Sequence, residues 1–178
     1  MLTTRLVSLD DAAELAAVAA AEREFLAPWE PARTPEWFTE AGQATAVALV
    51  LDDHSRGGAL PHVIVEEDDA GGSARIVGRI TLSGIVRGPF LSANLGYWVR
   101  RDCTGRGVAT RAAARMVGIA FGELGLHRLQ AGTLRHNHAS QKVLARNGFE
   151  RFGLAPRYLR IAGTWQDHVL FQLLNEQG

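Results

Sequence analysis

The sequence contains little cysteine, no excess of charge of either sign and no long apolar run. Cys103 is the one cysteine among 178 residues, so no disulfide forms within the chain and nothing indicates an oxidising compartment. An uninterrupted apolar stretch of about 20 residues, which a membrane-spanning helix needs, is also missing. These absences exclude a disulfide-stabilised scaffold and a helical membrane protein.

The charged residues balance, because 19 lysines and arginines stand against 19 aspartates and glutamates. A dedicated nucleic-acid binder usually carries a basic excess, so that class is disfavoured, although a local basic patch beside an anionic ligand is still allowed. The alanine-rich run 12–21 includes Glu14 and follows Asp10 and Asp11, unlike the uncharged core of a signal peptide. We therefore expect a cytoplasmic protein that contacts neither nucleic acid nor membrane.

The composition is that of an ordinary globular domain, with 47% apolar and 21% charged residues. The length suits a single domain over residues 1–178 with a substantial core. Residue patterns place helices between strands, an order typical of an open-sheet or three-layer α/β domain. Strands are expected at 3–7, 62–67, 75–85, 93–99, 127–134, from 149 onward, at 157–161 and at 165–174.

Capping residues and turn-forming residues predict where the early elements begin and end. Thr34 followed by Pro35 is typical of a helix start, which predicts a helix from there to about Asp53. The polar segment 68–73 is predicted to be the turn between two strands.

Similar signals occur in the second half of the chain. Asn137 is expected to cap a helix that ends at Arg146, and Gly125 to close the helix before it. Gly96 lies inside a predicted strand, which indicates a bulge or a close approach of another backbone.

A glycine-rich turn at residues 105–109 (GRGVA) joins a predicted strand to a predicted helix. The first N–H groups of a helix have no partner within the helix, and glycines let an anion approach them closely. Arg106 adds a positive charge. No Gly-Lys-Ser or Gly-Lys-Thr follows, and Thr110 and Gln130 stand where a dinucleotide site needs a small and an acidic residue. The expected phosphate ligand is therefore neither a nucleoside triphosphate nor NAD.

A second segment, residues 137–149 (NHASQKVLARNGF), follows the next predicted strand. Together with residues 104–110 (TGRGVAT), it resembles the GNAT superfamily of N-acetyltransferases, and within it the branch of ribosomal-protein alanine N-acetyltransferases. Residues 26–29 (LAPW), 95–99 (LGYWV) and 165–168 (WQDH) also resemble that branch, so the likeness covers nearly the whole chain.

The resemblance implies an α/β (α+β) fold with a mixed, mostly antiparallel central sheet flanked by helices. Its splayed central strands would be 93–99 and 127–134, with the pantetheine arm of acetyl-CoA between them. Acetyl-CoA is the implied co-substrate, and no metal is expected. The implied cofactor-binding residues are Trp98, Val99, Thr104, Gly105, Arg106, Gly107, Val108, Ala109, Thr110, Asn137, Ser140 and Lys142.

Two positions of the glycine turn match the family motif and one departs from it. Gly107 and Ala109 match, whereas Thr104 stands where glutamine or arginine is usual. The cradle is thus expected to act through backbone N–H groups and Arg106. The resemblance also places Asn137 against the pantetheine and Ser140 near the sulfur.

Family chemistry implies direct attack of an amine on the acetyl thioester. Ser140 is the expected proton donor to the leaving thiolate, and the backbone N–H near Tyr97 is expected to face the developing oxyanion. Trp29 and Asn94 are assigned to the acceptor. No general base is identified, because Asn94 and Arg157 stand where relatives often carry glutamate. Such a site favours an N-terminal amine, with a pKa near 8, over lysine, near 10.4.

Three functions stay open at this point. The first is acetylation of the N-terminal α-amine of a ribosomal or similar protein. The second is acetylation of a small amine, such as a polyamine or an amino sugar. The third is an acyl-CoA-binding regulatory module with weak catalysis.

The oligomeric state is equally open between a monomer and a homodimer. His136 and His138 have no accompanying ligand cluster, and Cys103 has no partner base, so neither a metal site nor a thiol nucleophile is expected.

Overall fold

The structure, a computed structural model, describes residues 1–67 and 74–176. The predicted turn 68–73 therefore lies outside the described residues. The helices are α1 (Ala12–Ala21), α2 (Arg23–Leu26), α3 (Glu40–Ser55), α4 (Val108–Gly118) and α5 (His138–Arg146). Short 3₁₀ or π turns are η1 (Leu9–Asp11), η2 (Pro35–Phe38), η3 (Arg101–Cys103) and η4 (Ile119–Glu123). The strands are β1 (Leu2–Leu6), β2 (Ala59–Glu67), β3 (Ala74–Val86), β4 (Ser92–Val99), β5 (Arg128–Leu134), β6 (Glu150–Ile161) and β7 (Thr164–Leu174).

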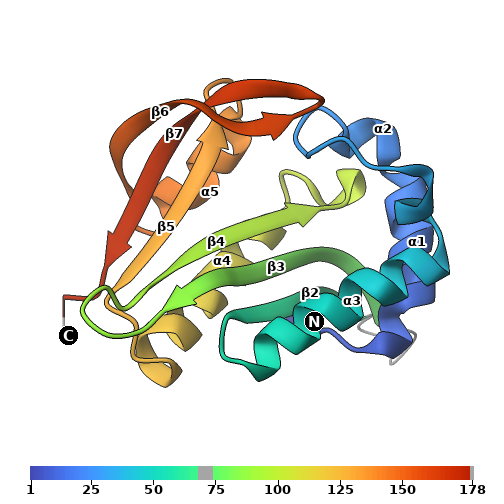
Figure 1. Cartoon of the computed structure of the whole chain (residues 1–178), viewed down its shortest axis with the longest axis horizontal. Coiled ribbons are helices and arrows are strands. Elements are labelled where there is room, and N and C mark those ends of the chain that lie inside the picture. Colours follow the sequence, from blue (N-terminus) through green and yellow to red (C-terminus); the bar gives the residue numbers. More distant parts are fainter. Residues whose placement is uncertain (68–73, 177–178) are drawn as a thin grey trace.

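The strands form one sheet in the order β1-β2-β3-β4-β5-β7-β6. All neighbours are antiparallel except β4 and β5, which run parallel. Only three residue pairs join these two strands, from Ser92↔Arg128 to Asn94↔Gln130. Beyond them the strands diverge, as Figure 1 shows, so the sheet opens in its middle. The predicted mixed sheet with splayed strands is confirmed.

The sheet separates two hydrophobic cores, because alternate side chains of a strand point to opposite faces. On β2, Val63 and Val65 pack with residues of α1 and α3, whereas Ile64 between them packs with residues of α4. Figure 1 shows α1 and α3 on one side of the sheet, with α4 and α5 on the other. Both faces are therefore covered by helices.

The helix predicted from Thr34 begins later than expected. Residues Pro35–Phe38 form only the 3₁₀ turn η2, and Thr39 is extended with φ −105° and ψ 155°. Thr39 then caps α3, because its Oγ1 accepts a hydrogen bond from Gly42 N at 3.1 Å. Two threonines with cap-like sequences lie five residues apart, and the one whose side chain makes the capping bond starts the α-helix.

The bulge predicted at Gly96 is also wrong. Gly96 pairs in register with Thr81, and the irregularity between β3 and β4 lies instead between Ser83 and Val86. A Cβ atom at Gly96 would meet nothing within 4 Å, so this glycine leaves open space above the strand.

The late turns agree with the sequence. Asn137 caps α5, and Gly125 and Gly148 have the positive φ values that close the preceding helices. The two strands predicted from 149 and at 157–161 are one continuous strand, β6, whose register shifts between Ala155 and Leu159. Within residues 1–67 and 74–176, no helix is long and apolar enough to cross a membrane.

His62 on β2 provides a test of this packing. Burial, with the charge of Arg115, lowers the pKa of His62 from 6.5 to about 4, and its Nδ1 lies 3.2 Å from Thr4 Oγ1. Since the folded-state pKa is below the unfolded-state pKa, the unfolded chain binds the proton first as the pH falls. The stability that neutral His62 contributes is present above about pH 6.5 and declines toward about pH 4.

We expect the melting temperature of wild type to fall more steeply than that of His62→Gln over this pH window. Thermal unfolding between these pH values, with the two proteins compared at neutral pH as a reference, measures the difference. A constant offset between the two proteins would contradict the assignment.

Candidate functional site

The opening between β4 and β5 holds a cavity of about 340 Å³, here called the central cavity. Residues 95–98 of β4 form one wall, and residues 131–134 of β5 form another. Ser140 and Leu144 of α5, with Asn137 directly before this helix, also line it. The cavity exists because β4 has no strand partner on this side after Asn94.

Tyr97 and Ser140 meet in the central cavity, although 43 residues separate them in sequence. The Tyr97 hydroxyl lies 2.8 Å from Ser140 Oγ and donates to Ser140 O at 3.2 Å. Burial raises the pKa of Tyr97 to about 12, against the opposing effect of the hydrogen bond with Ser140. The phenol is therefore protonated at neutral pH, and the two hydroxyls form a continuous donor pair.

Asn137 fixes the start of α5 next to this pair. Its Oδ1 accepts a hydrogen bond from Ser140 N at 3.1 Å, which satisfies one of the free N–H groups of the first turn. Asn137 also lines the central cavity.

The glycine turn precedes α4 as the sequence predicts. Gly105 and Gly107 have φ values of +74° and +75°, a left-handed conformation that favours glycine. The first bond of the helix runs from Arg111 N to Gly107 O, and within the described parts of the chain the N–H groups of residues 107–110 have no acceptor. Asn147 Nδ2 donates to Thr110 O at 3.2 Å and so links this turn to α5.

Arg106 is held by an ion-pair cluster beside the turn. Its Nη2 lies 2.6 Å from Glu66, which also pairs with Arg75 at 2.7 Å, and Arg75 reaches Asp102 at 2.9 Å. The hydrogen bond from Arg75 lowers the pKa of Asp102 to about 2. Thr104 Oγ1 donates to Arg101 O, so this side chain faces its own turn. The cluster fixes the conformation of the loop that leads into α4.

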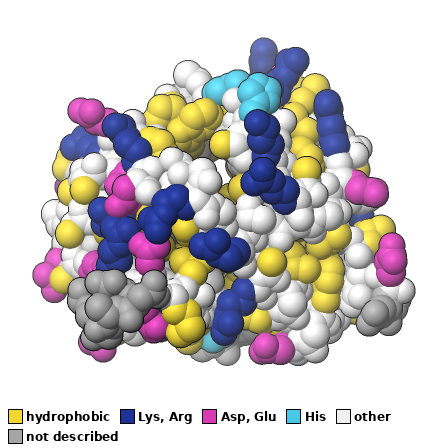
Figure 2. Space-filling model, turned by 180° about the vertical axis from the view of Figure 1, so that it is seen from behind, with side chains coloured by type: hydrophobic (Ala, Val, Ile, Leu, Met, Phe, Trp, Pro, Cys, Tyr) yellow, Lys and Arg dark blue, Asp and Glu magenta, His cyan; other side chains and the backbone are white. Residues whose placement is uncertain are grey.

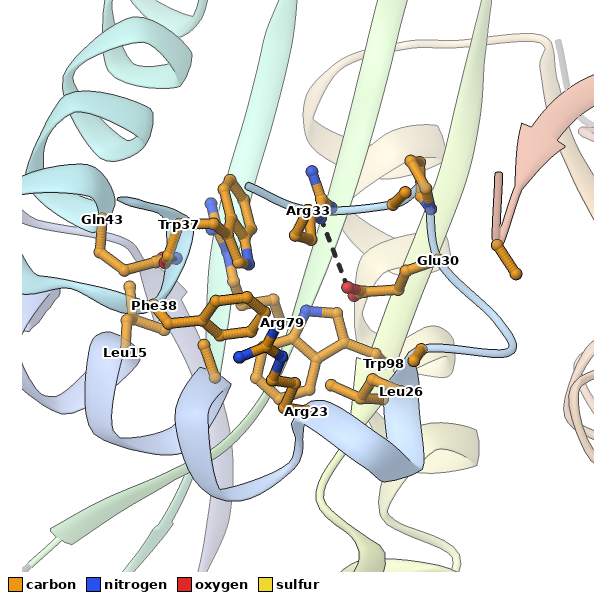
Figure 3. A pocket seen from close by; sticks show the side chains of 15 residues that line it. Leu15, Arg23, Leu26, Glu30, Arg33, Trp37, Phe38, Gln43, Arg79 and Trp98 are labelled. Atoms are coloured by element: carbon orange, nitrogen blue, oxygen red, sulfur yellow. Dashed lines mark hydrogen bonds and ion pairs between the residues drawn. The ribbon is translucent and has the colours of Figure 1, made fainter. Parts of the chain in front are cut away.

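A second cavity of about 330 Å³, here called the lateral cavity, lies between α1, α2, η2 and β3. It shares six lining residues with the central cavity, namely Leu26, Glu30, Arg33, Trp37, Arg79 and Trp98. The two cavities are therefore adjoining parts of one site. Figure 3 shows the polar side chains of Glu30, Arg33 and Arg79 converging there beside the ring of Trp98.

The charges in the lateral cavity are unevenly paired. Glu30 lies 3.5 Å from Arg33, whose guanidinium also stacks on Trp37 at 3.8 Å from the ring centroid. Burial raises the pKa of Glu30, and burial lowers the pKa of Arg79. No hydrogen bond or ion pair from the described residues reaches the Arg79 guanidinium. A backbone hydrogen bond also holds Glu30, because its carbonyl oxygen accepts from Ala162 N at 2.9 Å.

The other predicted residues lie at different distances from these cavities. Trp29 lines the central cavity, and its ring centroid is 5.4 Å from that of His136. Trp98 lines both cavities. Asn94 is exposed at the point where β4 and β5 separate, outside both linings, and Lys142 is exposed on α5. Within residues 1–67 and 74–176, no group of three or more metal-ligating side chains is present.

Residues 2–150 match the family model of the acetyltransferase (GNAT) domain. The chain belongs to the GNAT family. Over 172 residues it is 34% identical to the ribosomal protein uS5-alanine N-acetyltransferase of Escherichia coli (strain K12), covering 97% of this chain and 87% of that protein. It is an N-acetyltransferase, and the resemblance read from residues 104–110 and 137–149 is confirmed.

Two solved structures have the same fold. The ribosomal-protein-S5-alanine acetyltransferase of Vibrio fischeri superposes with a TM-score of 0.91 at 32% identity, covering 98% of this chain and 93% of that chain. Mycobacterium smegmatis RimJ, solved in complex with CoA-disulfide, gives a TM-score of 0.90 at 32% identity, covering 99% and 83%.

The sequence analysis does not predict the polar residues of the lateral cavity, Glu30, Arg33 and Arg79, as site residues. Glu30 and Arg33 lie in a proline-rich loop and Arg79 lies on a strand, so no short motif connects them. The one available signal is Trp29, which was assigned to the acceptor and precedes Glu30 directly.

The ionisation of Tyr97 tests the geometry of the hydroxyl pair. The chain has two tyrosines, so Tyr158→Phe leaves Tyr97 alone. We expect the tyrosinate absorbance of this variant to appear only near pH 12, because burial disfavours the phenolate. A spectrophotometric titration of the folded variant measures it, with circular dichroism as the control for unfolding. A midpoint near pH 10, the value of a free tyrosine, would be inconsistent with a buried hydroxyl.

Proposed function

We propose that residues 1–178 act as one domain that transfers the acetyl group of acetyl-CoA to the N-terminal α-amine of a ribosomal protein. The observation that carries this proposal is the 34% identity over 172 residues to an enzyme named for the alanine of ribosomal protein uS5. The site geometry supports it, because a protonated hydroxyl pair lies in a cavity between splayed strands.

The glycine turn suits the pyrophosphate of coenzyme A. The unpaired N–H groups of residues 107–110 lie at the positive end of α4. A Cβ atom at Gly105 would meet nothing within 4 Å, so the space for a ligand is open. Although the net charge is zero, Figure 2 shows Lys and Arg side chains spread over the face opposite the view of Figure 1. The exposed basic residues of α4 and α5 are Arg111, Arg115, Lys142 and Arg146.

The opening between β4 and β5 suits the pantetheine arm. An extended amide chain placed there meets the backbone groups of β4 that have no strand partner after Asn94. Asn137 lines the same cavity, and its side-chain amide supplies a further donor. In this placement Trp98 and Val99 lie along the arm on the β4 side.

The hydroxyl pair suits the reacting end of the donor. Acetyl-CoA supplies the thioester, and Ser140 Oγ, backed by Tyr97, gives a proton to the thiolate as it leaves. The backbone N–H groups of Tyr97 and Val99 on β4, which point away from β3, face the negative charge that develops on the acetyl oxygen. Trp29, which lines the central cavity, contacts the acceptor.

A substrate screen tests the proposal. Short peptides that differ in their first residue, together with a polyamine and an amino sugar, are incubated with acetyl-CoA and followed by thiol release. The proposal expects turnover of peptides, with alanine-initiated peptides preferred. Turnover of small amines alone would show that the acceptor is a small amine and not a protein N-terminus. Tight acetyl-CoA binding without any turnover would favour a regulatory module.

Removal of the hydroxyl pair should slow transfer. We expect Ser140→Ala to lower kcat by roughly 100-fold, since general-acid catalysis contributes about 10² or more. Tyr97→Phe should lower kcat less, and the double variant should lose less than the product of the two single losses, because both act through one hydrogen bond. Steady-state kinetics measures these effects, and acetyl-CoA affinity by calorimetry is the control. An unchanged kcat for Ser140→Ala would exclude its role as donor.

Closing the glycine turn with a side chain should weaken the donor site. Gly107→Ala forces alanine to adopt a φ of +75°, which costs about 1–2 kcal/mol of folding stability and shifts the first N–H groups of α4. We expect coenzyme A affinity, measured by calorimetry, to fall at least tenfold.

Gly88→Ala is the matched control for this variant. Gly88 has a φ of +72° in the turn between β3 and β4, and a Cβ atom there would meet nothing within 4 Å. It should lower the melting temperature similarly and leave coenzyme A affinity unchanged. Equal affinity losses in both variants would contradict the cradle.

A further inference from the structure

The lateral cavity contains an ionisable group that the proposed chemistry has not used. We infer that the carboxylate of Glu30 binds the ammonium group of the acceptor and takes its proton. The inference rests on the proposed function, because an amine acceptor must reach the central cavity and lose a proton before it attacks. It also fills the place of the general base that the sequence leaves without a candidate.

Glu30 is the one carboxylate among the described residues that line either cavity. Because it lines both, it lies where the lateral cavity adjoins the central cavity that holds the hydroxyl pair of Tyr97 and Ser140. Two contacts hold the loop that carries Glu30. The Trp29 ring packs near His136, and Glu30 O accepts a hydrogen bond from Ala162 N. The carboxylate is thus placed by the fold.

The charged and titratable groups around Glu30 come from its own loop and from α2, β3 and β7. Arg33 lies 3.5 Å away on the same loop, Arg79 projects from β3, and Arg23 lines the lateral cavity from α2, with its guanidinium over the Phe38 ring. His168 of β7 lines the central cavity, and its Nδ1 lies 3.0 Å from Gln166 O. Arg33 and Arg79 favour the ionised carboxylate, and the side chain of Glu30 is only 19% exposed.

Burial acts in the opposite direction to these arginines and raises the pKa of Glu30 above its ordinary value. A carboxylate with a raised pKa accepts a proton more readily, and this matches it better to an α-amine with a pKa near 8. Arg33 and Arg79 lower the pKa and so limit the effect. Burial therefore increases the basicity of the Glu30 carboxylate.

The proton and electron balance of the transfer is complete with these residues. The ammonium gives one proton to the Glu30 carboxylate, and the freed lone pair forms the C–N bond as the C–S bond breaks. The thiolate takes a proton from the Ser140–Tyr97 pair, and the second proton of the nitrogen restores that pair. Glu30 then releases its proton to water, so the products are the amide, the free thiol and one proton.

Glu30→Gln tests the inference, with Glu24→Gln as the matched control. Glu24 is an exposed glutamate on α2 outside both cavities. An alanine-initiated peptide and acetyl-CoA are the probes, and kcat/KM is measured from about pH 6 to pH 9.5. We expect Glu30→Gln to lose about 100-fold at pH 7, with the loss shrinking above pH 9 as the amine becomes neutral by itself. Glu24→Gln should follow wild type.

The dependence of the loss on pH separates a proton-accepting role of Glu30 from a positioning role. A loss of the same factor at every pH would make Glu30 a positioning residue and overturn the inference, as would an unchanged kcat/KM at pH 7. Coenzyme A affinity and the melting temperature report whether Glu30→Gln is folded. If it is not, Glu30→Asp keeps a carboxylate and should keep the wild-type dependence on pH, whereas a wild-type-like rate in Glu30→Ala would overturn the inference.

Failure of the proposed acceptor and failure of the Glu30 inference give different results. If wild type acetylates a polyamine but no peptide, the proposed acceptor fails, and the same pH comparison on the polyamine still tests Glu30. The pH-dependent loss should then extend to higher pH, because the amine is more basic.

Discussion

The site depends on a missing set of hydrogen bonds. β4 and β5 pair over three residues and then separate, although both strands continue. Backbone groups on facing strand edges normally pair with each other, so the gap must be filled by something else. Tyr97 fills part of it by reaching from β4 to Ser140 on α5. The rest is the central cavity, which offers unpaired backbone groups to a ligand that is extended and rich in amides.

Much of this arrangement could be predicted from local sequence. The glycine turn, the capping role of Asn137 and the closing glycines depend on backbone conformations that only a few residue types adopt. The splayed strands came from the resemblance. The helix boundary at Thr34 was wrong because Thr39 also has a capping side chain and only one of the two makes the bond. Gly96 was misassigned because a glycine that leaves space for a ligand looks the same in sequence as one that forms a bulge.

The lateral cavity could not be predicted in this way. Glu30 in a proline-rich loop reads as an ordinary surface acid, and Arg79 reads as the exposed position of a strand. Their altered environment arises from α1, α2, η2 and β3 closing around them, which are contacts between segments far apart in sequence. Charge pairing is similarly non-local, since Arg106 pairs with Glu66, 40 residues away. A motif therefore predicts the proposed donor side, whereas the proposed acceptor side can be described only from the folded chain.

The hydrogen bond between Ala162 N and Glu30 O joins the two halves of the sheet across the opening. The tip of the β6–β7 hairpin belongs to one half, and the loop after α2 lies over the other, so together they form an arch above the cavities (Figure 1). Changes in the two loops of the arch can therefore alter which acceptors enter while the donor elements stay intact. The contacts that select the acceptor can therefore vary in these loops while the glycine turn before α4 keeps its backbone conformation.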